Sequence, residues 1–177
     1  MAVCMPKVRV FVDTNVIIES FRTGCWTAIC EHFAIETVEK CIEEAMTGDR
    51  TDPRYVSVDA EVLNAGLAAR HAVGKIDVAT LVLEFPHAQG LDDGELHLLA
   101  YLRGEGVSED IPIMLSTADK AAVVLAGQLG WLDFLICLES LVERSGVTRG
   151  QVVALAGHYR ARWLDEVRVK IRLGVIL

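Results

Sequence analysis

Residues 8–21 have the sequence VRVFVDTNVIIESF, and this stretch decides the fold. Its β-branched and aromatic opening, Val8 to Val12, is typical of a fully buried strand. Asp13, Thr14 and Asn15 follow at once, and these residue types favour the start of a helix. The apolar run from Val16 to Phe21 continues as that helix. We therefore predict a buried strand that ends at Asp13 and turns directly into a helix.

Strand and helix patterns alternate along the rest of the chain, which predicts βαβ units and a parallel sheet covered on both faces. The expected fold class is α/β, with a central, mostly parallel sheet in a three-layer α/β/α arrangement. No repeat or linker divides residues 1–177, so we expect a single domain. The other predicted strands are 32–35, 56–58, 111–115 and 134–137. Further helices are predicted over 25–31, 37–45, 60–71, 76–84, 92–102 and 138–144. Another helix is expected to follow residues 116–119 and to end near 127–130, and residues 151–172 are expected to form a helical extension.

Composition excludes several classes of protein. Hydrophobic residues make up 52% of the 177 residues and charged residues 24%, so a large core is expected and disorder is not. No apolar run reaches the length of about 18 residues that a membrane span needs. Asp13 interrupts the first apolar stretch and no cleavage site follows, which argues against export. Five cysteines without a CxxC pair indicate reduced thiols, so we expect a cytoplasmic protein.

The net charge of −8 is unusual for a protein that binds nucleic acid, because phosphate contacts need a basic surface. The C-terminal stretch is the exception. A nucleic-acid-binding face is one explanation for its basic residues, and a solvated helix face is the other. These residues are Arg160, Arg162, Arg168, Lys170 and Arg172.

Acidic residues follow the predicted strands at one edge of the sheet. Asp13 comes directly after the first strand, and Asp119 comes four residues after residue 115. The carboxyl ends of parallel strands meet at one edge, where sites of α/β proteins form. Each acid also has a structural explanation as a helix cap or a first-turn charge, and Asp92 and Glu95 have capping-box spacing. One divalent cation with oxygen ligands would explain Asp13, Glu95 and Asp119 together.

Three segments resemble the PIN domain, a nuclease family that includes toxins of toxin–antitoxin pairs and RNA-processing enzymes. They are VFVDTNVII at residues 10–18, LDDGELHLLAYL at 91–102 and IMLSTADKAAVVLAGQLG at 113–130. The match ends near Glu143. We therefore expect a core over residues 1–145 and a helical extension over 146–177.

The resemblance implies a metal-dependent endoribonuclease. Asp13, Glu95 and Asp119 would hold Mg²⁺ or Mn²⁺, and Asn15 and Thr117 would orient these ligands. The family has a further acid on the helix after its second strand, which makes Glu43 the fourth expected catalytic residue. The alternatives are Glu39 and Glu36 on the same predicted helical face, and Asp92 beside Glu95. The implied partners are an RNA substrate and an antitoxin protein, and the extension is a candidate homodimer interface.

Two other enzyme classes fit the sequence less well. A haloacid-dehalogenase-type phosphatase needs a second Asp two residues after the first, where this chain has Asn15. A receiver domain needs an acidic partner beside Asp13, which the sequence lacks. A catalytically silent PIN-like module that binds protein or nucleic acid stays open as the non-enzymatic alternative.

Overall fold

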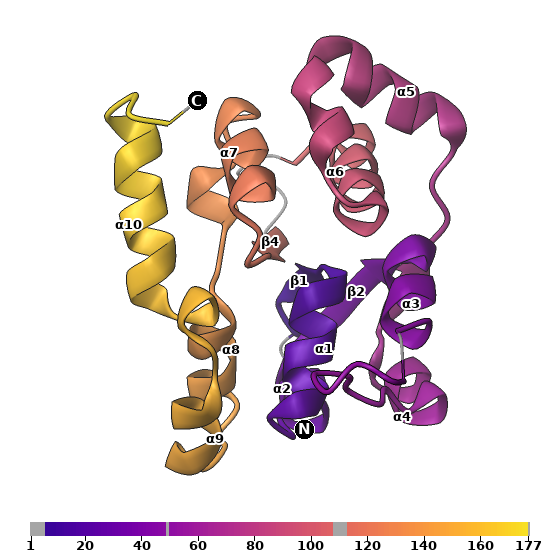
Figure 1. The fold of residues 1–177 in the computed structure, drawn as a ribbon, viewed down its shortest axis with the longest axis vertical. Helices are drawn as coiled ribbons and strands as arrows, with labels where there is room; N and C mark the ends of the chain where they lie inside the picture. The colour runs from indigo at the N-terminus through magenta and orange to yellow at the C-terminus, as the bar shows by residue number, and fades with distance from the viewer. Residues whose placement is uncertain (1–5, 49, 108–112, 177) are drawn as a thin grey trace.

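Four parallel strands form the sheet, and the strand predicted from residues 8–12 lies inside it. The computed structural model describes residues 6–48, 50–107 and 113–176 (Figure 1). In the order β3-β2-β1-β4, the central strand β1 pairs with β2 on one side and β4 on the other. The strands are β1 (Arg9–Val12), β2 (Ala34–Val38), β3 (Ala69–His71) and β4 (Ile113–Ser116).

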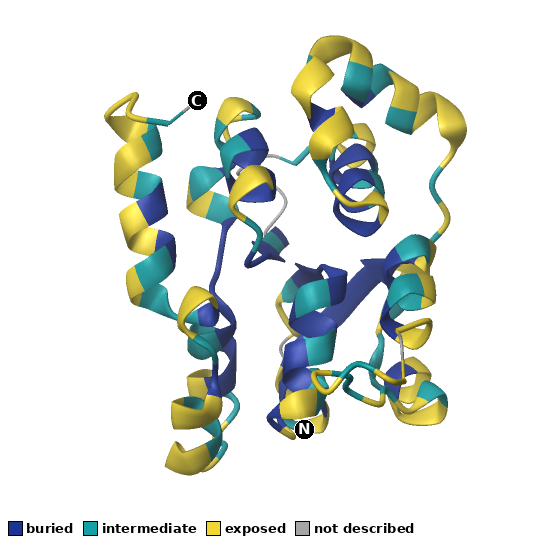
Figure 2. Ribbon diagram, in the orientation of Figure 1, coloured by how far each residue is buried: buried dark blue, intermediate teal, exposed yellow. Residues whose placement is uncertain are grey.

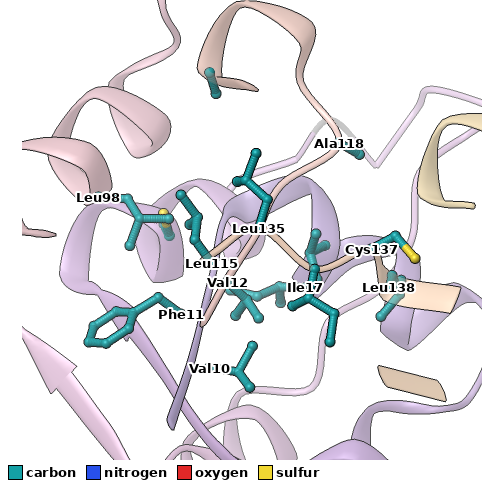
Figure 3. Packing of buried hydrophobic residues seen from close by; sticks show 14 of the residues in the cluster. Val10, Phe11, Val12, Ile17, Leu98, Leu115, Ala118, Leu135, Cys137 and Leu138 are labelled. Carbon is teal, nitrogen blue, oxygen red and sulfur yellow. The ribbon is translucent and has the colours of Figure 1, made fainter. Parts of the chain in front are cut away.

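Helices flank the sheet on both faces, which confirms the predicted α/β class. Val10, Phe11 and Val12 of β1 point to alternate faces, and all three are 0% exposed, as expected for a parallel sheet between helix layers. Figure 3 shows side chains around β1, with Leu115 of β4 and Leu98 of α6 nearby. The α-helices are α1 (Thr14–Arg22), α2 (Trp26–His32), α3 (Glu39–Met46), α4 (Ala60–Gly66), α5 (Lys75–Glu84), α6 (Asp93–Glu105), α7 (Lys120–Gln128), α8 (Leu138–Arg144), α9 (Arg149–Ala154) and α10 (Ala161–Arg172). The described residues also form the short 3-10 helices η1 (Pro86–Gly90), η2 (Leu132–Phe134) and η3 (Gly157–Tyr159).

The strand order places a topological switch point between β1 and β4. The chain runs from β1 to β2 to β3 in one direction and then returns to the other side of β1. Val12 pairs with Ser116, so the two strands end level with each other. The crevice at such a point, outside the carboxyl ends of the strands, is where open α/β sheets bind ligands.

The C-terminal extension packs against the core. The hydroxyl of Tyr159 donates to the carbonyl oxygen of Asn15 over 3.2 Å, and the amide of Ala156 donates to the buried Glu19 over 2.8 Å. Helix α10 lies along α7 and α8 (Figure 1). Its outer face is exposed, whereas Leu164 and Val167 are buried (Figure 2).

Several predicted elements are wrong, because pairing between distant segments overrides local sequence preference. The predicted helix 37–45 begins only at Glu39, since residues 34–38 form β2 and pair with both β1 and β3. The predicted helix 60–71 ends at Gly66, and residues 69–71 form β3. Residues 56–58 form no strand, and segment 134–137 contributes only an isolated bridge from Leu135 to Leu115. Residues 111 and 112 of the predicted fourth strand lie outside the described residues.

Candidate metal centre

Asp13 is the most deeply buried acid at the switch point. It follows β1 directly and is 0% exposed. Its Oδ1 accepts the amide of Val16 over 2.7 Å and so caps α1, as the capping alternative predicted. Its Oδ2, however, is buried without a hydrogen-bond partner. A helix cap accounts for only one of the two oxygens, and a buried carboxylate oxygen without a partner is costly.

Asp119 reaches the same edge from β4. It is the N-cap of α7, where Oδ1 accepts the amide of Ala122 over 2.8 Å. Of the two structural explanations, the helix cap therefore holds for Asp119 and the first-turn charge does not. Thr117 accepts the amide of Asp119 over 3.2 Å through its hydroxyl oxygen and so fixes the turn that carries this acid. The side-chain oxygen of Ser116 is buried without a partner, like Oδ2 of Asp13.

Glu95 enters the site from the first turn of α6 and is 3% exposed. Its Oε1 accepts a hydrogen bond from the side-chain amide of Asn15 over 3.0 Å. Asn15 lies in the first turn of α1, two residues after Asp13, so this bond joins the helix starts that carry two of the predicted ligands. This contact is the one that the orienting role implied for Asn15 by the resemblance would require.

Burial and like charge act together on these acids. Burial raises the pKa of Glu95 to about 8, and the charges of Asp13, Asp119 and Asp92 add to the rise. Burial also raises the pKa of Asp13 to about 6, with a further rise from Asp119. Thr117 lies near enough to lower the pKa of Asp13, although no contact to Oδ2 has hydrogen-bond geometry. The negative charge of Asp119 therefore acts on both Glu95 and Asp13, which places the three acids around one region.

Glu43, the fourth expected acid, lies on the surface. It is on the exposed side of α3, where its side chain is 61% exposed and pairs with Lys40 over 3.2 Å. Its neighbour Glu44 contacts residues beside the predicted ligands: it accepts the Thr14 hydroxyl over 2.7 Å and the amide of Gly94 over 2.9 Å. Cys41 and Ala45, one turn apart, are buried and mark the inner face of α3. Their spacing is the sequence signal that places Glu44 at the edge of this face and Glu43 opposite it.

Of the alternative acids, Glu36 and Glu39 lie away from this group, whereas Asp92 lies close enough to Glu95 to raise its pKa. Glu36 lies in β2, where it binds Arg9 at 2.6 Å and His71 at 2.7 Å, so its expected place on a helical face with Glu39 and Glu43 is wrong. Glu39 is exposed at the start of α3. Asp92 is the N-cap of α6, but its side chain makes no capping bond, so the expected capping box with Glu95 is incomplete.

The donor set fits a hard divalent cation. Carboxylate oxygens are the ligands that Mg²⁺ and Mn²⁺ prefer, and a cation would both satisfy the buried Oδ2 of Asp13 and relieve the repulsion at Glu95. Within residues 6–48, 50–107 and 113–176, no three His, Cys, Asp or Glu side chains stand as a group already arranged to hold an ion. The four cysteines of this part of the chain are free thiols, and Cys4 lies outside it.

The basic residues of the extension bind mostly within the chain. Arg168 donates to the carbonyl oxygens of Leu132 and Leu135, and Arg172 pairs with Asp133 over 2.6 Å. Arg160 donates to the carbonyl oxygens of Val153 and Leu155. Arg162 pairs with Glu166 over 3.0 Å, and Lys170 lines the same surface hollow as these two residues. Four of the five residues therefore have hydrogen-bond acceptors or acidic partners within the chain, although Arg162 and Arg172 stay largely exposed.

No helix in the described residues is long and apolar enough to cross a membrane. Comparisons of the chain with protein-family models, with curated proteins and with solved structures found no match.

Proposed function

We propose that this chain is a Mg²⁺- or Mn²⁺-dependent endoribonuclease whose site is formed by Asp13, Glu95 and Asp119. One observation carries the proposal: the buried Oδ2 of Asp13 has no hydrogen-bond partner in a place where Glu95 and Asp119 add further negative charge. Helix capping leaves that oxygen unexplained, and a cation ligand explains it. The PIN-like sequence segments support the same chemistry.

In this proposal each side chain has a separate task. Asp13, Glu95 and Asp119 would hold the cation, which supplies the Lewis acidity that activates water and offsets charge on a phosphodiester. Asn15 holds the carboxylate of Glu95 in place through its amide. Glu44 joins α3 to the start of α6 by accepting the amide of Gly94, and thereby fixes the helix turn that carries Glu95.

The proposal is tested with purified protein and end-labelled single-stranded RNA, in Mn²⁺, in Mg²⁺ and in EDTA. Cleavage that requires the cation, together with a metal-dependent rise in melting temperature, is the expected result. If neither RNA nor DNA is cut and no divalent cation raises the melting temperature, the nuclease proposal fails and a PIN-like binding module remains. An antitoxin partner belongs to the proposal only if expression of the wild type arrests growth and expression of Asp13→Asn does not.

A further inference from the structure

A cavity of about 550 Å³ opens directly beside Asp119. Three parts of the chain that are far apart in sequence form it: η1, the first turns of α7, and the segment after α10. Figure 1 shows the C-terminal end of the chain beside α7. The lining residues are His87, Gly90, Asp119, Lys120, Ala121, Val124 and Ile176.

The chemistry of the lining changes from one part of the cavity to another. Ala121, Val124 and Ile176 supply an apolar surface, and His87 supplies an aromatic ring that makes an edge-on contact with Phe85 at 6.2 Å between centroids. Lys120 adds a cation immediately after Asp119 in sequence. The cavity thus combines an apolar and aromatic part with the cation of Lys120, and it shares Asp119 with the proposed metal site.

We propose that this cavity binds one nucleotide of single-stranded RNA next to the phosphodiester that is cut. The base would lie against the His87 ring and the apolar surface, and Lys120 would bind an adjacent phosphate. Aromatic and apolar side chains hold unstacked bases in this way, and a lysine acts on phosphate as a point charge. The inference rests on the proposed nuclease function and specifies which form of nucleic acid the site accepts.

The size of the cavity favours a single strand, and its lysine favours a ligand that carries phosphate. Pockets of about 300–1,000 Å³ enclose small organic ligands, and one splayed-out nucleotide belongs to that class. A base in a duplex stays stacked and paired, so it cannot enter without the cost of unstacking. Lys120 also provides a local positive charge in a protein with a net charge of −8, whereas the arginines of the extension bind mostly within the chain.

Glycine positions offer a direct steric test. A Cβ added at Gly90 meets no atom within 4 Å, and the backbone there is not left-handed, so Gly90→Leu would project a side chain into open space at the cavity. Gly157 of η3 has the same two properties and does not line the cavity, which makes Gly157→Leu the matched control. Lys120→Ala removes the proposed phosphate contact, and Lys75→Ala on α5 removes an equal charge elsewhere.

The measurement is the fluorescence anisotropy of a labelled single-stranded 12-nucleotide RNA of mixed sequence. Titrations are run in Ca²⁺, and the probe is checked for integrity on a gel. We expect Gly90→Leu and Lys120→Ala each to weaken binding roughly tenfold, and both controls to match the wild type. Lys120→Ala should also lower the slope of log affinity against log salt by about 0.7, the value for one lost phosphate contact on a single strand.

The binding result and the cleavage result separate the two proposals. If Gly90→Leu and Lys120→Ala weaken binding while Mn²⁺ yields no cleavage, the cavity inference holds and the nuclease proposal fails. If the wild type cleaves RNA while Gly90→Leu binds and cleaves like the wild type, the cavity inference is overturned and the nuclease proposal stands. Absence of wild-type binding, equal competition by a duplex of the same sequence, or an equal loss in Lys170→Ala on α10 would also overturn the cavity inference.

Discussion

The side-chain amide of Asn15 donates a hydrogen bond to Oε1 of Glu95 over 3.0 Å, across 80 positions of sequence. Asn15 is in the first turn of α1 and Glu95 is in the first turn of α6. The bond therefore holds the carboxylate of Glu95 at the same switch point as Asp13. Partners that orient a ligand in this way affect metal affinity strongly, although they do not touch the metal.

Removal of this amide should weaken the metal site more than it weakens the fold. We expect Asn15→Ala to lower Mn²⁺ affinity by about 10–100-fold, because Glu95 loses its orienting hydrogen bond. The melting temperature in EDTA should change little, since alanine favours a helix more than asparagine does. Isothermal titration with Mn²⁺ measures the affinity. The control is Asn64→Ala, which removes a hydrogen bond from a side-chain amide to the carbonyl oxygen of Ala60 and should leave Mn²⁺ affinity unchanged. Equal Mn²⁺ affinities of Asn15→Ala and the wild type would contradict the orienting role.

The metal-free protein should lose stability as the pH rises. The pKa of Glu95 is raised from 4.5 to about 8, mainly by burial. Between these two values the folded protein keeps a proton on Glu95 that the unfolded chain has released, so the free energy of unfolding falls with rising pH. Asp13, whose pKa is raised from 3.8 to about 6, adds to the fall at lower pH.

Melting temperatures in EDTA from pH 5 to pH 8.5 measure this effect. The wild type should become less stable toward the upper end, and Glu95→Gln should show a smaller decline because it cannot ionise. Excess Mn²⁺ should counteract the decline, since the cation favours the ionised acids; saturation at 100 times Kd adds about 2.7 kcal/mol. Parallel pH profiles for the wild type and Glu95→Gln in EDTA would show that Glu95 titrates normally.

Adjacent glutamates of α3 should behave differently. Glu44 accepts hydrogen bonds from Thr14 and from the amide of Gly94, whereas Glu43 pairs with Lys40 on the surface. Glu44→Ala leaves a buried amide and hydroxyl without their acceptor, so we expect a loss of about 1–3 kcal/mol. Glu43→Ala should stay within about 0.5 kcal/mol of the wild type. Urea unfolding measures both, and a larger loss from Glu43→Ala would show that the wrong glutamate has been assigned to the site.

Gly94 is required because α3 approaches α6 closely at this point. A Cβ at Gly94 would lie 2.4 Å from Oε2 of Glu44 and 2.6 Å from Oγ1 of Thr14. Alanine usually stabilises a helix by about 1 kcal/mol relative to glycine. Here the neighbouring side chains would have to move away from the new Cβ, which should cost about 1–3 kcal/mol and outweigh that gain. Gly104, in the same helix, would meet only Asp77 at 3.9 Å. We therefore expect Gly94→Ala to lower the melting temperature and Gly104→Ala to raise it; a rise in both would exclude close packing at Gly94.

The sequence predicts the parts of the site that depend on neighbouring residues. A buried strand followed at once by Asp13 is a local pattern, and so is Asp119 shortly after β4, so both acids could be placed at one edge of the sheet. The position of Glu44 depends on which face of α3 meets α6, and this is fixed by packing with residues 50 positions away. Local preference favours a helical face for Glu36, whereas pairing of its segment with β1 and β3 makes it a strand residue, and such pairing is not visible in the local sequence.

The partners of the basic extension also depend on distant residues. Its basic residues fit a nucleic-acid-binding face or a solvated helix face, and nothing in the local sequence indicates the partners of the arginines. Asp133 and the carbonyl oxygens of Leu132 and Leu135 lie more than 30 residues earlier in the chain and bind Arg172 and Arg168. The cavity beside Asp119 is likewise not predictable from local sequence, because three distant segments form it.

The central claim is that Asp13 helps to hold a cation that cleaves RNA, and Asp13→Asn tests it most directly. Asparagine is nearly isosteric and can still cap α1 through its side-chain oxygen, so the fold should persist. The substitution replaces only the buried Oδ2 by an amide nitrogen, which cannot bind a cation. The measurement is the rate of cleavage of labelled single-stranded RNA in Mn²⁺ by both proteins, with folding checked by circular dichroism. We predict wild-type cleavage that EDTA abolishes and a loss of at least about 100-fold in Asp13→Asn; equal metal-dependent cleavage by a folded Asp13→Asn would contradict the account.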